Sequence, residues 1–224
     1  MEKWGKIDNL NIIIKGFFNN DKLEGYGEVF DKEENINYKG YWKKGLLDGI
    51  GIQYNETFIY EGYFKEGKKN GKGIQIFKKE NEKYKGDWKD GNYEGYGIYY
   101  YSNGNKYIGQ WKNNIKEGFG ELIWANGKKF IGYFKNDNRN GFGIYLNEKN
   151  NISICFWNGG KKYGIEKCFL NKNKINYKRW KNNKFEVVNK SDIFKIMKED
   201  NKETYINIYN MDYDNIINFM DLSN

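Results

Sequence analysis

Few side chains in this sequence can carry out acid–base or nucleophilic chemistry. Histidine, the commonest general base, is absent from the 224 residues. The two cysteines, Cys155 and Cys168, therefore have no imidazole partner to activate a thiol. Without histidine we find no cluster of metal ligands, and two cysteines make no disulfide framework, which favours free thiols in a reducing compartment. We predict no catalytic residue, no metal and no cofactor.

Carboxylates recur along the chain, but not in a pattern that suggests catalysis. They stand just before paired glycines, at Glu24, Asp48, Glu94 and Glu117. These acids recur because the sequence repeats, and they do not converge as an acid–base pair. Each Gly-x-Gly precedes another strand-like run instead of a helix, so it matches neither the dinucleotide fingerprint nor the Walker phosphate loop. The sequence therefore predicts a protein that is not an enzyme.

A repeat of 22 to 24 residues organises most of the chain. Each copy reads aromatic-x-Gly-x-aromatic, six variable positions, then Gly-x-Gly, as in YKGDWKDGNYEGYGIYY from Tyr84. Close copies begin at Ile14, Tyr38, Tyr60, Tyr84, Tyr107 and Phe130. A degenerate copy begins at Ile152, and a further fragment surrounds Tyr177 and Trp180. Self-similarity at a fixed period indicates a stacked repeat architecture.

This pattern resembles the MORN repeat (membrane occupation and recognition nexus), strongly over about 14–150 and weakly over 151–185. The resemblance implies one β-hairpin per repeat, stacked into a single elongated, twisted antiparallel sheet. Period-two runs separated by turn residues favour the same all-β repeat array independently. We expect an N-terminal cap strand in 1–13, six repeats in 14–151, degenerate repeats in 152–188, and a short, acidic helical tail in 189–224.

Glycine alternates with aromatic residues because positions one, three and five of a strand share a face. A glycine leaves the backbone bare, so that a ring from a neighbouring strand can lie flat on it. We therefore expect the repeated rings and glycines to be structural first. The same rings are also our candidates for a groove that binds a partner: Tyr38, Trp42, Tyr60, Phe64, Tyr84, Trp88, Tyr107, Trp111, Phe130 and Phe134.

The second face of the expected sheet carries an apolar stripe. Its first position in each repeat lies between the paired glycines and is occupied by Tyr26, Ile50, Lys72, Tyr96, Phe119 and Phe142. The next position on the same face carries Ile52, Ile74, Ile98 and Ile144. The last position carries Phe30, Tyr54, Ile76, Tyr100, Ile123 and Leu146. An exposed apolar stripe marks a surface for a partner or a membrane. The alternative is that sheet twist folds this stripe into the floor of an internal groove.

A row of lysines follows the second aromatic residue of five successive repeats. They are Lys43, Lys65, Lys89, Lys112 and Lys135. With two strands per repeat, neighbouring lysines would stand about 10 Å apart and their charges would add to one positive field. Such a ladder suits anionic lipid headgroups or an acidic protein. The alternative is a solvated row that keeps the protein soluble and blocks edge pairing.

The C-terminal tail differs from the repeats. From Ser191 onward it lacks glycine, spaces its apolar residues as a helix does, and carries three lysines and seven acids, a net charge of −4. Ser191 with Asp192, and then Asp214, suggest helix N-caps. We expect the tail to dock on the basic remainder of its own chain or of a second copy, or to cap the open sheet edge. The docking candidates are Ile193, Ile196, Met197, Tyr209, Ile216 and Met220.

These features together indicate a non-enzymatic scaffold or adaptor. The resemblance implies that it binds a partner helix or peptide in a groove of the sheet, organises membrane-associated cytoskeletal structures, and self-associates. The alternative function is peripheral binding to anionic phospholipid through the lysine ladder. Nucleic acid is disfavoured, since Arg139 and Arg179 are the only arginines. Without a signal peptide or a membrane-spanning run, we expect a cytoplasmic protein, at the membrane periphery, the cytoskeleton or a cilium or flagellum.

Overall fold

A computed structural model describes residues 3–171, 173–193, 195–196 and 210–221. Its contacts divide the chain into two compact units, Met1–Ile115 (unit 1) and Lys116–Asn224 (unit 2). The division falls inside the predicted six-repeat segment, next to a hairpin turn, where each hairpin touches only its neighbours. Met197 and Tyr209, two of the tail docking candidates, lie outside the described residues.

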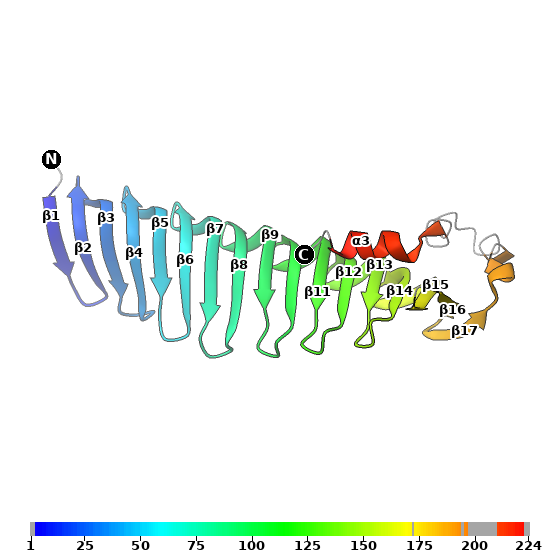
Figure 1. Ribbon diagram of the computed structural model, residues 1–224. Helices are drawn as coiled ribbons and strands as arrows, with labels where there is room; N and C mark the ends of the chain where they lie inside the picture. Colours follow the sequence, from blue (N-terminus) through cyan, green and yellow to red (C-terminus); the bar gives the residue numbers. More distant parts are fainter. Residues whose placement is uncertain (1–2, 172, 194, 197–209, 222–224) are drawn as a thin grey trace. The chain divides into compact units, whose positions relative to one another are not determined.

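Antiparallel strands are the main elements of both units (Figure 1). Unit 1 contains β1 (Lys3–Asp8), β2 (Ile12–Asn19), β3 (Lys22–Asp31), β4 (Ile36–Lys43), β5 (Leu46–Tyr54), β6 (Phe58–Lys65), β7 (Lys68–Phe77), β8 (Glu82–Lys89), β9 (Asn92–Tyr100) and β10 (Lys106–Lys112). Unit 2 is built from β11 (Ile115–Ile123), β12 (Lys129–Lys135), β13 (Asn138–Leu146), β14 (Ile152–Asn158), β15 (Lys161–Asn171), β16 (Lys174–Lys181), β17 (Lys184–Val188), the 3-10 turn η1 (Lys190–Asp192) and the helix α3 (Tyr213–Asp221). The predicted all-β repeat array with a short C-terminal helix is confirmed.

One row of glycines crosses every strand of unit 1. Each glycine lies opposite the next in the strand register, in the order Gly5, Gly16, Gly27, Gly40, Gly51, Gly62, Gly73, Gly86, Gly97 and Gly109. A Cβ added to Gly62 would stand 2.5 Å from the Gly73 Cα, a distance that real Cβ atoms do not reach. Only glycine therefore fits the middle of this row, while a Cβ at Gly5 would come no closer than 3.4 Å to Phe18. The bare band leaves room for side chains.

Rings fill that bare band in the repeats that begin at Tyr60 and Tyr84, as the sequence predicts, whereas the buried Leu23 covers Gly16 and Gly27, and Leu47 lies against Gly51. A Cβ on Gly73 would meet the Tyr60 ring at 2.4–2.7 Å, and one on Gly97 would meet the Tyr84 ring at 2.3–2.6 Å. Each ring thus lies on the glycine of the neighbouring strand. We call the side of the sheet that carries these rings the ring face, and the other side the open face.

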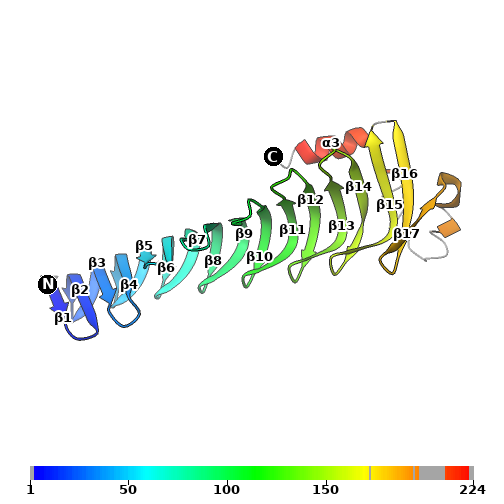
Figure 2. The same ribbon diagram turned by 90° about the horizontal axis from the view of Figure 1, so that it is seen from below.

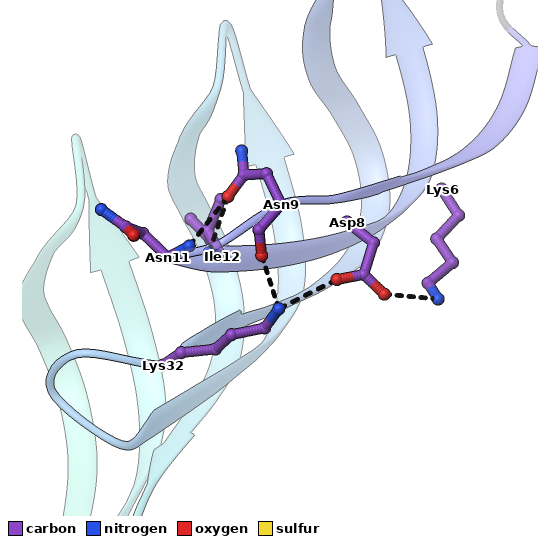
Figure 3. Close-up of polar contacts among 6 residues, drawn as sticks. All are labelled: Lys6, Asp8, Asn9, Asn11, Ile12 and Lys32. Atoms are coloured by element: carbon purple, nitrogen blue, oxygen red, sulfur yellow. Dashed lines mark hydrogen bonds and ion pairs between the residues drawn. The ribbon is translucent and has the colours of Figure 1, made fainter.

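Polar contacts join the turns of successive hairpins. At the N-terminal end the Lys32 ammonium contacts the Asp8 carboxylate at 2.9 Å and donates to the Asn9 carbonyl at 2.5 Å (Figure 3). Hydrogen bonds from Lys6 and Lys32 lower the pKa of Asp8 to about 2. The same contact recurs between the turns that follow β5 and β7, where the Lys78 ammonium donates to the Asn55 carbonyl at 2.6 Å. These two lysines each tie one inter-repeat turn to the turn before it.

The degenerate seventh repeat is shifted by one residue from its predicted start at Ile152. The register pairs Gly141 with Trp157 and Gly143 with Cys155, as Gly71 pairs with Trp88 in a regular repeat. Ser153 therefore stands where other repeats carry the ring, and Cys155 stands at a glycine position. Because a serine leaves the backbone uncovered, the cysteine side chain has the space that a ring normally fills.

The two helical elements of the tail have other N-cap residues than the sequence predicts. Ser191 and Asp192 lie inside η1, whose N-cap residue is Asn189. The cap of α3 is Asp212, two residues before the predicted Asp214, because its Oδ1 accepts the backbone N–H of Asn215 at 2.8 Å. An aspartate oxygen bonded to the third residue of a helix is the usual N-cap geometry.

Helix α3 packs on the open face of unit 2, beside the strands β13 to β15 (Figure 2). Ile216 is buried in one cluster with Ile144, Ile152, Ile154 and Phe169, and Met220 packs against that cluster. Ile193 and Ile196 are buried in a second cluster with Ile165 and Tyr177. The described part of the tail thus docks within its own chain. None of the described helices is long and apolar enough to cross a membrane.

Candidate partner-binding surface

The ring face is filled by its own side chains. Eight of the ten predicted groove residues are buried, while Tyr38 and Trp42 are partly buried. The Tyr84 ring, with no exposed surface, stacks on Tyr93 at 3.7 Å between ring centroids and meets Trp88 edge-on at 5.3 Å. Ring-on-ring packing of this kind leaves no space for a ligand. The predicted groove residues therefore form the core of the sheet, and a partner has to bind elsewhere.

Hydrogen bonds fix these rings to the backbone. The Trp88 Nε1 donates to the Gly73 carbonyl at 3.2 Å, and the Trp111 Nε1 donates to the Gly97 carbonyl at 3.3 Å. The Tyr84 hydroxyl donates to the Asp87 carbonyl at 2.9 Å. The repeats that begin at Tyr84 and Tyr107 thus hold the neighbouring repeat through one tryptophan and their own strand through one tyrosine. Since a buried polar group needs such a partner, these bonds explain why the repeat uses tyrosine and tryptophan.

The open face of unit 1 presents the predicted apolar stripe to solvent. Ile50 and Tyr96 are each about half exposed, and so is Tyr63, which the stripe prediction omitted. Tyr63 follows Gly62 directly, so the alternation of a strand places it on the face opposite the glycine and ring. The alternation of side chains along the strand is therefore the sequence signal that would have placed Tyr63 in the stripe. The equivalent residues Tyr41 and Tyr133 are also half exposed.

A groove of about 570 Å³ runs across the open face of unit 1, and we call it the open-face groove. Its apolar lining is Ile50, Tyr63, Ile74, Tyr96 and Ile98, its charged lining is Glu61, Lys72 and Lys85, and its floor is the backbone of Gly62, Gly73 and Gly86. The Lys72 ammonium forms an ion pair with the Asp87 carboxylate at 2.6 Å. The groove combines exposed aromatic surface with cations at its margin, which suits an apolar ligand with acidic groups.

Buried thiols and acids replace a ring in the seventh repeat. Cys155 and Cys168 are both buried, and burial raises the pKa of both thiols, which makes them poor nucleophiles. Glu166, at a glycine position, pairs with Lys162 and accepts the Trp180 Nε1 hydrogen bond at 2.6 Å. This carboxylate takes the place of the backbone carbonyl that binds tryptophan in regular repeats. Among the described residues, no three metal-ligating side chains lie together.

A partly buried lysine on the ring face was not predicted. The Lys69 Nζ lies 4.8 Å from the centre of the Tyr60 ring and 5.1 Å from that of Trp88, and it donates to the Gln75 Oε1 at 2.5 Å. Burial lowers the pKa of Lys69 to about 8. Ring faces attract the ammonium and offset part of the cost of its burial.

We expect Lys69 to make stability depend on pH. Lysine in the unfolded chain titrates near pH 10.4, so between about pH 8 and 10 the unfolded state binds more protons. The free energy of unfolding should therefore rise by about 2 kcal/mol over that window, at no more than about 1.4 kcal/mol per pH unit. Below about pH 7 the lysine is protonated in both states, and its contribution stays constant.

Urea unfolding at pH 7.5, 8.5 and 9.5 measures this rise. It should disappear in Lys69→Met and persist in Lys68→Met, whose side chain is exposed. Burial raises the pKa of Tyr60 and Tyr84, so stability should fall again above pH 10, where unfolded tyrosines ionise first. An equal rise in the wild type and in Lys69→Met would contradict the assignment.

Comparison with known proteins places these repeats in a family. A family model described as MORN repeat matches residues 15–28, 38–55, 60–81, 84–106, 107–129 and 130–151, which is more than half of the chain. The chain belongs to the MORN repeat family. MORN repeats are generally a non-catalytic repeat and binding module. The matched segments end before the seventh repeat, where serine and cysteine replace the ring and the glycine.

Among curated proteins, none matches the chain. One solved structure with similarity is the SAS-4 (dCPAP) TCP domain in complex with a proline-rich motif of Ana2 (dSTIL) of Drosophila melanogaster. The sequence identity is 12%, the TM-score is 0.42, and the match covers 74% of this chain and 84% of that one. At this level of similarity, neither the fold nor the ligand of that domain carries over to this chain.

The recurring carboxylates of the MORN repeats support turns. Glu94 Oε2 accepts the backbone N–H of Asn113 at 3.1 Å, and Glu117 Oε2 accepts that of Asn136 at 3.0 Å. Both asparagines have positive φ, near 49°, as two-residue hairpin turns require. Glu24 and Asp48 make the same bond to the next turn. The acids are therefore part of the repeat's structure, in agreement with their interpretation as non-catalytic.

The five ladder lysines all reach solvent from the ends of their strands. Lys43, Lys65, Lys89 and Lys112 end β4, β6, β8 and β10 in unit 1, and Lys135 ends β12 in unit 2. Residues 1–115 contain 19 basic and 17 acidic side chains, so their net charge is only +2. Residues 116–190 contain 16 basic and 6 acidic ones, a net +10, which the acidic tail from Ser191 onward reduces to +6 for unit 2. Most of the net positive charge thus belongs to unit 2, whereas four of the five ladder lysines belong to unit 1.

Proposed function

We propose that this protein is a non-enzymatic scaffold or adaptor that binds a segment of a partner protein on the open face of unit 1. The open-face groove, with Ile50, Tyr63 and Tyr96 about half exposed, is the observation that carries the proposal. Contiguous exposed aromatic surface favours a protein contact, and tyrosine supplies much of the binding energy at such contacts. Lys72 and Lys85 would steer an acidic segment into place.

Selection from a random linear peptide library against the full chain tests this function. Selected peptides should bind the wild type and lose at least tenfold in affinity to a Tyr96→Glu and Ile50→Glu double variant, because each glutamate removes apolar contact and repels an acidic ligand. The matched control is Leu10→Glu, since Leu10 is almost fully exposed outside the groove. Equal loss in both variants, or no selected binder, would count against the proposal.

A second function, binding to anionic phospholipid, is supported by the exposure of all five ladder lysines. A Lys65→Glu, Lys89→Glu and Lys112→Glu variant should then lose co-sedimentation with phosphoinositide vesicles, and the wild type should lose it at high salt. Peptide binding in the groove should survive both changes. Such an adaptor would work in the cytoplasm, at membrane-associated cytoskeletal or ciliary structures, and it would organise them also by self-association.

A further inference from the structure

Helix α3 shows how this chain covers the open face of its own repeats. Ile216 is 2% exposed in its cluster, and Tyr213, Ile217 and Met220 pack around it. Their spacing is i, i+3, i+4 and i+7, which places all four on one side of a helix. The exposed Asp214 and Asn218 occupy the other side. The open face of unit 2 is thus a surface on which an amphipathic helix already lies.

The residues beneath α3 have equivalents in the open-face groove. Phe142 and Ile144 follow Gly141 and Gly143 on β13 as Tyr96 and Ile98 follow Gly95 and Gly97 on β9. Ile144 is buried beneath α3, whereas its equivalent Ile98 is only partly buried. Phe142 is partly buried against the same cluster, whereas its equivalent Tyr96 is 54% exposed. Within unit 1, no described helix covers the corresponding positions. The same repeat positions are therefore covered in one unit and open to solvent in the other.

Lysines flank both surfaces in similar positions. Lys167, opposite Ile154 in the register, donates to the Met211 carbonyl just before α3. Burial lowers the pKa of Lys167, and the charge of Asp212 offsets part of that shift. Lys85 occupies the corresponding row in unit 1, opposite both Ile74 and Ile98. The N-terminal end of a helix bound in the same way would therefore lie at Lys85, as the residue before Asp212 lies at Lys167, and an acidic N-cap there would be attracted by the Lys85 charge.

We propose that the open-face groove binds an amphipathic α-helix of another protein. That helix presents apolar residues at i, i+3, i+4 and i+7 and an acidic residue at its N-cap, and it lies as α3 lies on unit 2. This inference rests on the proposed function, since it names the conformation and chemistry of the partner segment. The apolar side enters between Ile50, Ile74 and Tyr96, and the acidic end faces Lys72 and Lys85.

A labelled peptide with the sequence of residues 210–221 provides the probe. Because so short a helix is marginal in water, a lactam between Asp214 and a lysine from Asn218→Lys, on the exposed side, holds it helical. We expect fluorescence anisotropy to show binding to the full chain, with at least tenfold weaker binding to Tyr96→Glu. Leu10→Glu should bind as the wild type does, and a peptide with Ile216→Asp should not bind. Circular dichroism verifies that each variant is folded.

Photo-crosslinking from the peptide position of Ile217 identifies the site. Crosslinks to β5–β9 support the proposal, whereas crosslinks to β13–β15 would mean that the peptide only exchanges with the chain's own α3, which overturns it. Lack of binding also overturns it.

A wild-type dimer in analytical ultracentrifugation that dissociates on Tyr96→Glu would identify a second copy as the occupant, which contradicts the stated partner. If library peptides need Tyr96 but the helical probe does not bind, the proposed function stands and the helix inference fails.

Discussion

Replacing Tyr84 with alanine should cost unit 1 about 3–5 kcal/mol of its free energy of unfolding, the range for deleting a large buried ring. The ring is fully buried, lies on Gly97, and contacts Trp88, Tyr93 and Trp111 within 5.6 Å between centroids. A single-layered sheet has no second layer that could collapse into the resulting cavity. The loss should therefore lie at the upper part of this range, and chemical denaturation measures it.

Two further variants separate the contributions of the Tyr84 side chain. Tyr84→Phe keeps the ring but removes the hydrogen bond to the Asp87 carbonyl, so we expect a cost of about 1 kcal/mol. Tyr96→Ala removes a half-exposed tyrosine from the open face and should change stability by less than about 0.5 kcal/mol. Similar costs for Tyr84→Ala and Tyr96→Ala would contradict the distinction between the ring face and the open face.

We also predict which strands of unit 1 lose stability when Tyr84 is replaced by alanine. In a repeat array each hairpin depends on its nearest neighbours, so a lost ring acts locally. Hydrogen exchange in Tyr84→Ala should accelerate most in β8 and β9, and next in β7 and β10, which contact them. Strands β1 and β2 should keep their protection. Uniform acceleration throughout unit 1 would indicate that unit 1 unfolds as one cooperative block.

The repeat pattern was enough to predict the fold, because each of its features has one physical use. Only glycine fits at Gly62, Gly73 and Gly86, and the rings of Tyr60 and Tyr84 fill the band that these glycines leave. Strand alternation then assigns every residue to a face. The sequence could not show which face is available to a partner, because aromatic residues on either face have the same composition. Burial of the rings on Tyr60 and Tyr84 decides that question.

The errors in the seventh repeat and in the tail have local causes. Phe156 and Trp157 are adjacent aromatic residues, so the sequence alone did not indicate which of them takes the tryptophan position; the pairing of Trp157 with Gly141 does. In the tail, Asp212 and Asp214 are both suitable caps, and the choice follows from the packing of Ile216 on unit 2. Tertiary contacts selected one of two locally equivalent options in each case.

The second large loss of stability should follow from a substitution in the helix α3. Ile216→Asp places a carboxylate among Ile144, Ile152 and Ile154, and none of these residues can donate a hydrogen bond to it from a side chain. Burying an unpaired charge is more costly than the loss of the apolar contact, so the helix should leave the sheet instead of keeping the charge buried. We expect unit 2 to lose about 3 kcal/mol of stability, in the range for disrupting a buried isoleucine.

Detachment of α3 would uncover the apolar open face of unit 2, and this gives the measurement. Ile216→Asp should increase the fluorescence of an apolar dye such as ANS and should remove the hydrogen-exchange protection of α3, while β13 and β14 keep their backbone pairing. Asn218→Asp adds the same charge to the exposed side of the helix and should change neither signal. If Ile216→Asp leaves α3 protected, then the cluster around Ile144 does not hold the helix, and α3 cannot serve as a template for a partner in the open-face groove.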